Sequence, residues 1–459
     1  MATLIADEFF NDPDVVKAKD LLINALIKHQ SNITKVQPPK SSLVCDYDKL
    51  VQELAVIRGG KLFFPYIGSG IGNGPFVELA DGSVKYDFIN GIGVYHFGHS
   101  HPDLTRTAIE AALSDTVMQG HLQQTIQGLN FSKKLLTLAN AKGANLEHCF
   151  LTSTGAMAGE NALKVAFQSK FPATRVLAFK HCFAGRTIFL SQVTDKADFR
   201  SGIPLTFPVD YVPFFDPKNP TQSIKEAKAV LREYIDRYPS QHVAMFFELI
   251  LGEYGYYRGS AEFHSELMEI CKESNIAVLV DEVQTFGRTE EPFAFQYYGL
   301  DRYIDVVWVG KVTQVCATLF SKDFNPKPGL LSQTFTSSTT AIAVGEVILD
   351  SFLNGKFFGP KGKIAKFHKI FVGELKKLCE KHPKLIRGPF GEGIMIGITV
   401  FDGNAEKTKA FILKLFENGV ISHIAGKNPA RVRFLIPIGV IENKHIIEVC
   451  KIIEKTLLL

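Results

Sequence analysis

The chain has 459 residues, of which 46% are hydrophobic and 21% are charged, and its formal net charge is +4. This length is too great for one small core and predicts two or three domains. The small net charge and the lack of a dense Lys/Arg cluster argue against nucleic-acid binding, and no apolar run approaches the ~20 residues that span a bilayer. We therefore expect small-molecule partners, no nucleic acid and no membrane.

The cysteines are scattered and odd in number, and none forms a C-x-x-C pair: Cys45, Cys149, Cys182, Cys271, Cys316, Cys379 and Cys450. This pattern argues against a disulfide framework or a zinc site and favours a reducing compartment. The N-terminus, 1-MATLIADEFF-10, carries acidic residues where a signal peptide has basic ones. We expect a cytoplasmic protein without a metal.

Short elements of several kinds follow one another along the chain. Residues 1–67 combine a helical pattern with an irregular stretch, and residues 68–102 are glycine-rich, which predicts short strands with a hairpin turn at 81-DG-82. Farther along, helical patterns alternate with short apolar runs. The predicted helices are 103–115, 125–140, 159–170, 222–237 and 260–274, and the predicted strands are 148–153, 175–180, 242–248, 276–283 and 304–311.

This alternation is typical of an α/β fold. It predicts a large domain with a mainly parallel sheet covered by helices on both faces. Beyond about residue 345 the pattern changes to that of a smaller α+β domain, which includes 387-RGPFGEGIMIGITVF-401 and a closing helix over 441–457. We expect an N-terminal segment, 1–67, that packs with the small domain, a large ligand-binding domain, 68–345, and the small C-terminal domain, 346–459.

The carboxyl ends of the predicted strands carry residues that suit a ligand site, because ligands of open α/β sheets bind there. The first strand is followed by 153-STGAMAGENALK-164, a small-residue turn that opens a helix and presents N–H groups suited to a phosphate. Asp281 ends a buried strand, where it is either a helix cap or ion-pair partner, or the partner of a protonated ring nitrogen. Lys311 ends another strand, where it either reaches solvent or keeps an amine that forms a Schiff base.

These three features together match the needs of one cofactor. Pyridoxal 5′-phosphate (PLP) requires an imine-forming lysine, an acid at its pyridine nitrogen and a phosphate cradle. The helix start lacks the P-loop spacing and the G-x-G-x-x-G spacing, so a nucleotide is disfavoured. Each signal alone is weak, but three of them at strand ends of one sheet predict a PLP enzyme.

Two motifs then make the chain recognisable. The run 279-LVDEVQTFGRT-289, followed by 304-IDVVWVGK-311, resembles the signature of class III aminotransferases, which have PLP fold type I. The order of motifs from about 70 to 455 is similar to that of the family. Within the family, 155-GAMAGENALKVAF-167 and 310-GKVTQVCA-317 resemble segments of lysine 6-aminotransferases.

The resemblance implies roles around the cofactor ring. Lys311 would form the Schiff base with the cofactor and move the proton, and Asp281 would keep the pyridine nitrogen protonated. Phe183 and Val283 would lie on the two faces of the ring, and Gln284 would hydrogen-bond near its phenolic oxygen.

The resemblance also implies how the phosphate is bound. The backbone N–H groups of Gly155 and Ala156 would contact it, and Thr334 would reach the phosphate of the neighbouring subunit. Such sharing would make the protein a homodimer with its active sites at the interface.

Three further residues would bind the substrates. Arg186 and Arg433 match family positions that bind carboxylates, a task that suits a guanidinium group. Glu253 matches the glutamate that pairs with the second arginine when a substrate has only one carboxylate. From the sequence alone Arg431 is an alternative to Arg433, which the V-R-F context favours.

The resemblance implies an aminotransferase that moves the terminal amino group of L-lysine or a similar ω-amino acid to 2-oxoglutarate, giving a semialdehyde and L-glutamate. Acetylornithine, ornithine and 4-aminobutyrate are alternative donors, although Phe76 stands where ornithine aminotransferases have a tyrosine. A PLP aminomutase of the same fold is a more distant alternative. The chain lacks the family's usual glycine between Thr285 and Phe286, which keeps a non-catalytic homologue as another.

Overall fold

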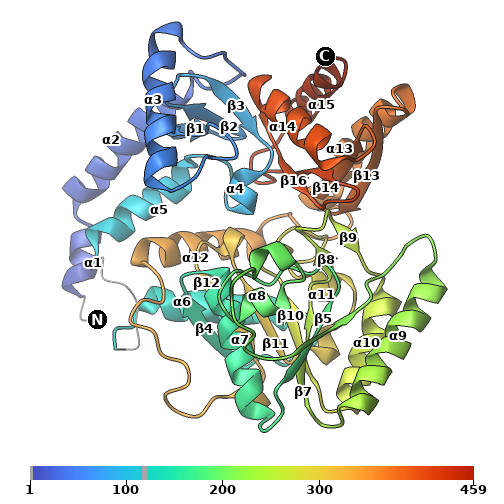
Figure 1. The fold of residues 1–459 in the computed structure, drawn as a ribbon. Coiled ribbons are helices and arrows are strands. Elements are labelled where there is room, and N and C mark those ends of the chain that lie inside the picture. The colour runs from blue at the N-terminus through green and yellow to red at the C-terminus, as the bar shows by residue number, and fades with distance from the viewer. Residues whose placement is uncertain (1–3, 116–121) are drawn as a thin grey trace. The chain divides into compact units, whose positions relative to one another are not determined.

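The computed structural model describes residues 4–115 and 122–459. Backbone contacts divide the chain into two compact units. Figure 1 shows the fold, with the colour running from the N-terminus in blue to the C-terminus in red. Unit 1 comprises Met1–Thr116, Lys369–Pro389 and Ile398–Leu459, and unit 2 comprises Val117–His368 and Phe390–Gly397. Residues 68–116 thus group with the C-terminal segments in backbone contacts, while the domain boundaries expected at 67 and 345 stay a prediction.

Unit 2 contains a seven-stranded sheet with the strand order β4-β12-β11-β10-β7-β5-β6. Its strands are β4 (His148–Thr152), β5 (Arg175–Phe179), β6 (Val209–Val212), β7 (His242–Phe247), β10 (Ala277–Asp281), β11 (Val306–Val309) and β12 (Cys316–Phe320). Only β12 runs antiparallel to its neighbours β11 and β4, whereas the central pairs are parallel. The prediction of a mainly parallel sheet is confirmed.

The centre of this sheet is fully covered. Every residue of β7, β10, β11 and β12 is buried, which explains why these strands are continuous apolar runs rather than alternating ones. The longer helices around the sheet are α6 (Ile126–Ala139), α7 (Gly155–Ser169), α9 (Pro220–Arg237), α10 (Ala261–Glu273) and α12 (Thr339–Asn354). Helix α7 packs on β4, β11 and β12, α10 packs on β10 and α9, and α6 packs against α12.

Short elements connect the strands and helices of unit 2. They are α8 (Leu190–Val193), η1 (Ala197–Phe199), β8 (Ile250–Leu251), β9 (Tyr257–Arg258), α11 (Ala294–Tyr297), η2 (Asp301–Tyr303), η3 (Lys311–Thr313) and η4 (Lys322–Phe324). Strands β8 and β9 form a small antiparallel pair. Several of these elements lie just after the sheet strands and carry the predicted site residues.

Hydroxyl side chains fix where three of the long helices begin. Thr154 accepts a hydrogen bond of 3.1 Å from the N–H of Met157 at the start of α7. Ser260 and Ser338 cap α10 and α12 in the same way. Such caps satisfy N–H groups that have no acceptor inside the helix, so the start of α7 directly after β4 follows from the sequence S-T-G.

Two four-stranded sheets, β1-β2-β3-β15 and β13-β14-β17-β16, contain the strands of unit 1, while Phe390–Gly397, which include the end of β13 and the start of β14, belong to unit 2. The strands are β1 (Gly68–Asn73), β2 (Phe76–Leu79), β3 (Val84–Asp87), β13 (Ile386–Glu392), β14 (Met395–Val400), β15 (Val420–Ile421), β16 (His423–Ala425) and β17 (Arg431–Leu435). The helices are α1 (Ile5–Phe10), α2 (Pro13–Gln30), α3 (Ser41–Ile57), α4 (Asn90–Gly93), α5 (Pro102–Leu113), α14 (Ala405–Glu417) and α15 (Asn443–Leu457), together with α13 (Lys363–Lys381), which begins in unit 2.

Within unit 1 the two ends of the chain pack together. The Phe64 ring stacks on Phe416 with centroids 4.9 Å apart, and the Phe63 ring stacks on His423 at 4.8 Å. Strand β3 pairs with β15 in parallel. The predicted hairpin turn lies between β2 and β3, where Gly82 has φ +77°, a conformation that glycine adopts without strain. Nowhere in residues 4–115 or 122–459 is there a helix with the length and apolar character needed to cross a membrane.

Candidate active site

The carboxyl ends of the parallel strands in unit 2 bring polar residues to one edge of the sheet. Helix α7 begins with Gly155 directly after β4, and the loop that carries Phe183 follows β5. Glu248 follows β7, Asp281 is the last residue of β10, and Lys311 opens η3 after β11. Strand ends in one parallel sheet therefore group the residues that the sequence predicted as a site.

Asp281 is a buried carboxyl group under the influence of Lys311. Its Oδ1 atom accepts a hydrogen bond of 2.8 Å from the N–H of Val283. Burial raises the pKa of Asp281 to about 7, while the Val283 N–H and the positive charge of Lys311 oppose that rise. A cation placed against this carboxyl would favour its ionised form, as the protonated nitrogen of a pyridine ring would do.

Lys311 is half-buried and has φ +57°, which is the left-handed region. Gly310, just before it, has extended backbone, so the chain turns sharply where the buried strand ends. The lysine side chain acts electrostatically on the buried Asp281. This interaction favours the prediction that the amine of Lys311 acts inside the site over the alternative that it reaches solvent.

Four segments approach closely where glycine leaves space. A Cβ atom on Gly155 would lie 3.0 Å from Cγ1 of Val283, and one on Gly310 would lie 3.4 Å from the same atom. A Cβ on Gly185 would lie 3.5 Å from the Cβ of Ala156. The start of α7 thus lies against the turn after β10, the end of β11 and the loop after β5.

The start of α7 has the properties of a phosphate cradle. The helix has 15 residues, and the N–H groups of Gly155 and Ala156 lie in its first turn, where no intrahelical acceptor exists. The helix dipole makes this end electropositive. Together with the buried acid and the lysine, these N–H groups complete the set of donors that PLP requires.

Gln284 presents a buried acceptor that the protein leaves open. Its Oε1 atom makes no hydrogen bond to any residue in the described part of the chain. A Cβ on Gly252 would lie 2.5 Å from that atom, so the side chain packs directly on the Gly252 backbone. A buried amide oxygen without a hydrogen bond costs free energy of folding. The phenolic hydroxyl of PLP is a donor that could form this hydrogen bond with Gln284.

The shortened turn after Gln284 is well packed. Phe286 is fully buried and its ring lies 4.8 Å from Phe293 and 5.7 Å from Phe352. Arg288 donates a hydrogen bond of 2.7 Å to the carbonyl oxygen of Gln284. The lack of one glycine therefore leaves a turn that is held by aromatic packing and by a buried arginine.

Glu248 belongs to the same cluster, although no function was predicted for it from the sequence. Its Oε2 accepts a hydrogen bond of 2.8 Å from the N–H of Phe183, and its Oε1 accepts one of 2.8 Å from the N–H of Gly252. Burial raises the pKa of Glu248 to about 8, and the nearby Asp281 adds to this rise. Glu248 follows a buried strand just as Asp281 does, so the same strand-end signal could have identified it.

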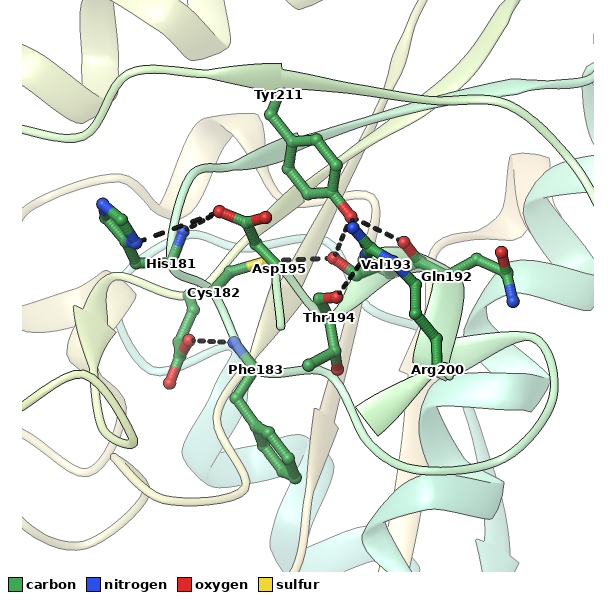
Figure 2. A network of polar contacts seen from close by, with 10 residues as sticks. His181, Cys182, Phe183, Gln192, Val193, Thr194, Asp195, Arg200 and Tyr211 are labelled. Carbon is green, nitrogen blue, oxygen red and sulfur yellow. Dashed lines mark hydrogen bonds and ion pairs between the residues drawn. The ribbon is translucent and has the colours of Figure 1, made fainter. Parts of the chain in front are cut away.

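The loop after β5 is held by a polar network, which Figure 2 shows around Thr194, Asp195 and Tyr211. Arg186 on this loop is exposed, and its guanidinium carbon lies 3.8 Å from the centroid of the Phe199 ring. Phe183, half-buried on the same loop, meets the Phe199 ring edge-on at 6.2 Å. Phe199 had no signal in the sequence.

The other predicted residues lie farther from these contacts along the chain. Glu253 is half-buried in the turn after β8, and Thr334 is exposed on the segment before α12. Arg433 lies in β17 of unit 1 opposite His423, and it is 1% exposed, as Arg431 is buried too. The structure thus groups Gly155, Asp281, Val283, Gln284 and Lys311 in unit 2, while the roles of Glu253, Thr334 and Arg433 stay predictions.

No group of three or more His, Cys, Asp or Glu side chains with the geometry of a metal site occurs within residues 4–115 and 122–459. The residues at the strand ends instead fit PLP: an amine, a buried acid, an open amide oxygen and a helix N-terminus. This set on a mainly parallel α/β sheet defines a PLP-dependent enzyme of fold type I.

Residues 68–457 match the model of the family "Aminotransferase class-III". The chain belongs to this family and is a PLP-dependent transaminase. This finding confirms the predicted enzyme class and cofactor.

Sequence relatives include acetylornithine aminotransferases. That of Methanocaldococcus jannaschii is 28% identical over 392 residues, which cover 82% of this chain and 89% of the relative. The mitochondrial enzyme of Saccharomyces cerevisiae is 25% identical over 398 residues, which cover 84% of this chain and 89% of the relative.

Solved structures with the same fold include a lysine aminotransferase from M. tuberculosis, with a TM-score of 0.78, 22% identity, and coverage of 89% of this chain and 99% of that one. The ornithine aminotransferase from Toxoplasma gondii ME49 has a TM-score of 0.75, 23% identity, and coverage of 91% of this chain and 98% of that one. At these identities the likeness shows the fold.

Proposed function

We propose that this transaminase takes the terminal amino group of an amino acid that also carries an α-carboxylate, and transfers it to 2-oxoglutarate. The donors that fit are N-acetylornithine, ornithine and lysine, with 4-aminobutyrate as a shorter relative. The observation that carries the proposal is the exposed Arg186 beside the cofactor residues. In the described part of the chain its guanidinium stacks on Phe199 and makes no ion pair or hydrogen bond, which suits a substrate carboxylate.

Each residue around the cofactor ring has a separate proposed role. PLP, when bound, supplies an aldehyde and an electron-withdrawing ring. Lys311 holds the amine that binds the cofactor and that moves a proton at the substrate carbon, and Asp281 holds negative charge at the ring nitrogen. Phe183 and Val283 flank the ring and exclude water, and Gln284 contacts its phenolic oxygen.

The remaining proposed roles concern the phosphate and the substrate. The N–H groups of Gly155 and Ala156 hold the phosphate. Arg433 takes the other carboxylate of a dicarboxylic substrate, and Glu253 pairs with it when a donor has none there. Ping-pong exchange between donor and 2-oxoglutarate follows, because one site serves both substrates in turn.

The choice of donor has two candidates. The curated relatives named acetylornithine aminotransferases favour N-acetyl-L-ornithine. The segments around Gly155 and Lys311 resemble lysine 6-aminotransferases, and a lysine aminotransferase shares the fold, which together support L-lysine. We place N-acetylornithine first, because the sequence relatives that carry this name match more than four fifths of the chain.

A visible absorption spectrum tests both the function and the donor. The purified holoenzyme is mixed with each donor alone, without 2-oxoglutarate, and loss of the yellow band is followed. Bleaching by N-acetylornithine or lysine, reversed by 2-oxoglutarate, is the expected result. Turnover of an amino acid without any keto acid would instead show an aminomutase, and a protein that never binds PLP would overturn the proposal.

We also propose that the protein is a homodimer, in which Thr334 contacts the phosphate bound by the partner. Its exposure in the single chain supports this role. For the location we propose the cytoplasm. All seven cysteines are free thiols in the structure, which suits a reducing compartment.

A further inference from the structure

Phe199 contacts two candidate site residues at once. The guanidinium carbon of Arg186 lies 3.8 Å from the centroid of the Phe199 ring, and the Phe183 ring meets it edge-on at 6.2 Å. Both partners belong to the loop after β5, whereas Phe199 ends the short helix η1. A single aromatic ring therefore joins the residue proposed to bind a carboxylate and the residue proposed to cover the cofactor.

The segment before Phe199 is fastened to that loop by hydrogen bonds. The hydroxyl oxygen of Thr194 accepts from the N–H groups of Ala184 and Gly185 at 2.9 and 3.2 Å, and the hydroxyl donates to the carbonyl oxygen of Gly185 at 2.9 Å. Asp195 accepts a bond of 2.7 Å from the N–H of His181. Figure 2 shows His181, Thr194 and Asp195 within one network of polar contacts. These hydrogen bonds hold the two segments together.

The residue after Phe199 is fastened as well. Arg200 donates from Nη1 to the carbonyl oxygen of Thr194 at 2.9 Å and to the hydroxyl of Tyr211 at 3.1 Å. The Tyr211 hydroxyl donates in turn to the carbonyl oxygen of Gln192 at 2.6 Å (Figure 2). The residues on both sides of Phe199 are therefore held by hydrogen bonds. This fixes the position of the Phe199 ring against which the Arg186 guanidinium stacks.

Stacking on Phe199 leaves the N–H edge of the Arg186 guanidinium group open. An aromatic ring covers the face of a guanidinium group, whereas a carboxylate binds along its N–H edge. In residues 4–115 and 122–459, Arg186 makes no ion pair that would occupy this edge. Lys196 also lies over the Phe199 ring, at 4.8 Å, but it is more distant than Arg186.

We infer that Phe199 is a positioning residue for substrate selection, whose ring holds the Arg186 guanidinium so that its N–H edge meets a substrate carboxylate. This inference deepens the proposed function and rests on its assignment of Arg186. It predicts that Phe199 affects substrates with a carboxylate at that position and leaves other amines unaffected.

The test compares two substitutions at one position in the holoenzyme. Phe199→Leu keeps an apolar side chain and removes the aromatic face, and Phe199→Tyr keeps the face. We expect F199L to raise the KM for 2-oxoglutarate about fivefold, the size of an exposed cation–π contact, with little change in kcat. F199Y should behave like the parent enzyme.

A binding measurement separates this inference from the proposed reaction. Glutarate, an unreactive dicarboxylate, is titrated by calorimetry, and F199L should raise its Kd by about the same factor. In an Arg186→Ala background, F199L should have no further effect, because the two residues act as a unit. With n-butylamine, which has no carboxylate, the rate of bleaching should be equal in F199L and the parent enzyme.

Phe189→Leu is the matched control, since this exposed aromatic precedes α8 and stacks on Phe207 rather than on Arg186. The inference is overturned if F199L weakens glutarate binding equally with and without Arg186, or if the parent protein binds no glutarate. A parent enzyme that binds glutarate through Arg186 and Phe199 but transaminates no ω-amino acid would refute the proposed function and leave the inference intact.

Discussion

Glu248 and Asp281 stand side by side at the carboxyl ends of the adjacent parallel strands β7 and β10, and both carboxyl groups are buried. Burial raises their pKa values to about 8 and about 7, and the negative charge of Asp281 adds to the rise at Glu248. The positive charge of Lys311 opposes the rise in the pKa of Asp281. One more positive charge near this pair would therefore stabilise the ionised carboxyl groups, and a protonated pyridine nitrogen supplies such a charge.

This pair predicts how the stability of the cofactor-free protein depends on pH. The folded-state pKa values lie above the ordinary values of 4.5 for a glutamate such as Glu248 and 3.8 for an aspartate such as Asp281. The folded protein therefore holds more protons than the unfolded chain between about pH 4 and pH 8, and stability falls as pH rises through that window. The contribution of one such group is on the order of 1 kcal/mol per pH unit.

Glu248→Gln keeps the side-chain shape and removes the titration, so thermal unfolding of the cofactor-free variant should depend less steeply on pH. Exposed Glu226, which pairs with Gln222, provides the control Glu226→Gln. Equal slopes of Tm against pH for the parent and E248Q would contradict the prediction.

Lys311→Ala should lower transamination by a factor of roughly 10³ or more, because it removes the amine proposed to bind the cofactor and to move the proton. After borohydride reduction, mass spectrometry of the parent peptide containing Lys311 should show the added cofactor mass, and the variant should lack it. Lys322→Ala, at the exposed start of η4, should retain both. Labelling of a different lysine would refute the assignment.

Gly252→Ala should weaken cofactor binding with little loss of stability. The added Cβ would lie 2.5 Å from Oε1 of Gln284, and this side-chain end can swing away at small cost. The amide would then no longer meet the cofactor, so the Kd for PLP, measured by absorbance titration of the cofactor-free protein, should rise about tenfold, the loss expected when one good hydrogen bond is removed. Gly373→Ala, where a Cβ meets nothing within 4 Å, is the control. Unchanged PLP affinity in G252A would exclude Gln284 as a contact.

Thr334→Ala tests whether the active site is shared between two chains. Thr334 is exposed in the single chain, so the substitution should leave folding unchanged and lower PLP affinity about tenfold through the loss of one phosphate contact. The neighbouring exposed Ser332 provides the control Ser332→Ala.

A mixture of chains makes the same test sharper. When Lys311→Ala and Thr334→Ala chains are refolded together, a mixed dimer contains one site with both native residues. Activity should therefore return at low PLP concentration, where neither variant alone is active. Failure of the mixture to regain activity would argue that Thr334 acts within its own chain or not at all.

The sequence could predict the central strands because burial on both faces requires continuous apolar runs. Strand β7 (HVAMFF) and strand β10 (AVLVD) have this pattern. Strand β6 (VDYV) was missed because it lies at the sheet edge, where its alternate residues are half-exposed and its Asp210 is polar. Strand β12 was missed because it follows η3 after a few residues and returns antiparallel.

In the candidate site, too, some residues could be predicted from the sequence and others could not. Asp281 and Lys311 could be predicted since each stands where an apolar strand ends. Glu248 also stands where an apolar strand ends, but its hydrogen bonds to the backbone of Phe183 and Gly252 depend on the paths of two loops and could not be predicted. Phe199 was beyond prediction because its contact with Arg186 depends on the path of an irregular segment.

Lys311 has a backbone conformation that residues other than glycine seldom adopt, with φ +57°. For such residues this conformation costs roughly 1–2 kcal/mol. A glycine at this position would relieve that strain and remove the amine, so a chain selected for thermal robustness alone would drift toward Lys311→Gly. A laboratory screen for heat resistance that ignores turnover should therefore yield more stable, inactive proteins at this position, which places stability and catalysis in direct competition at a single residue.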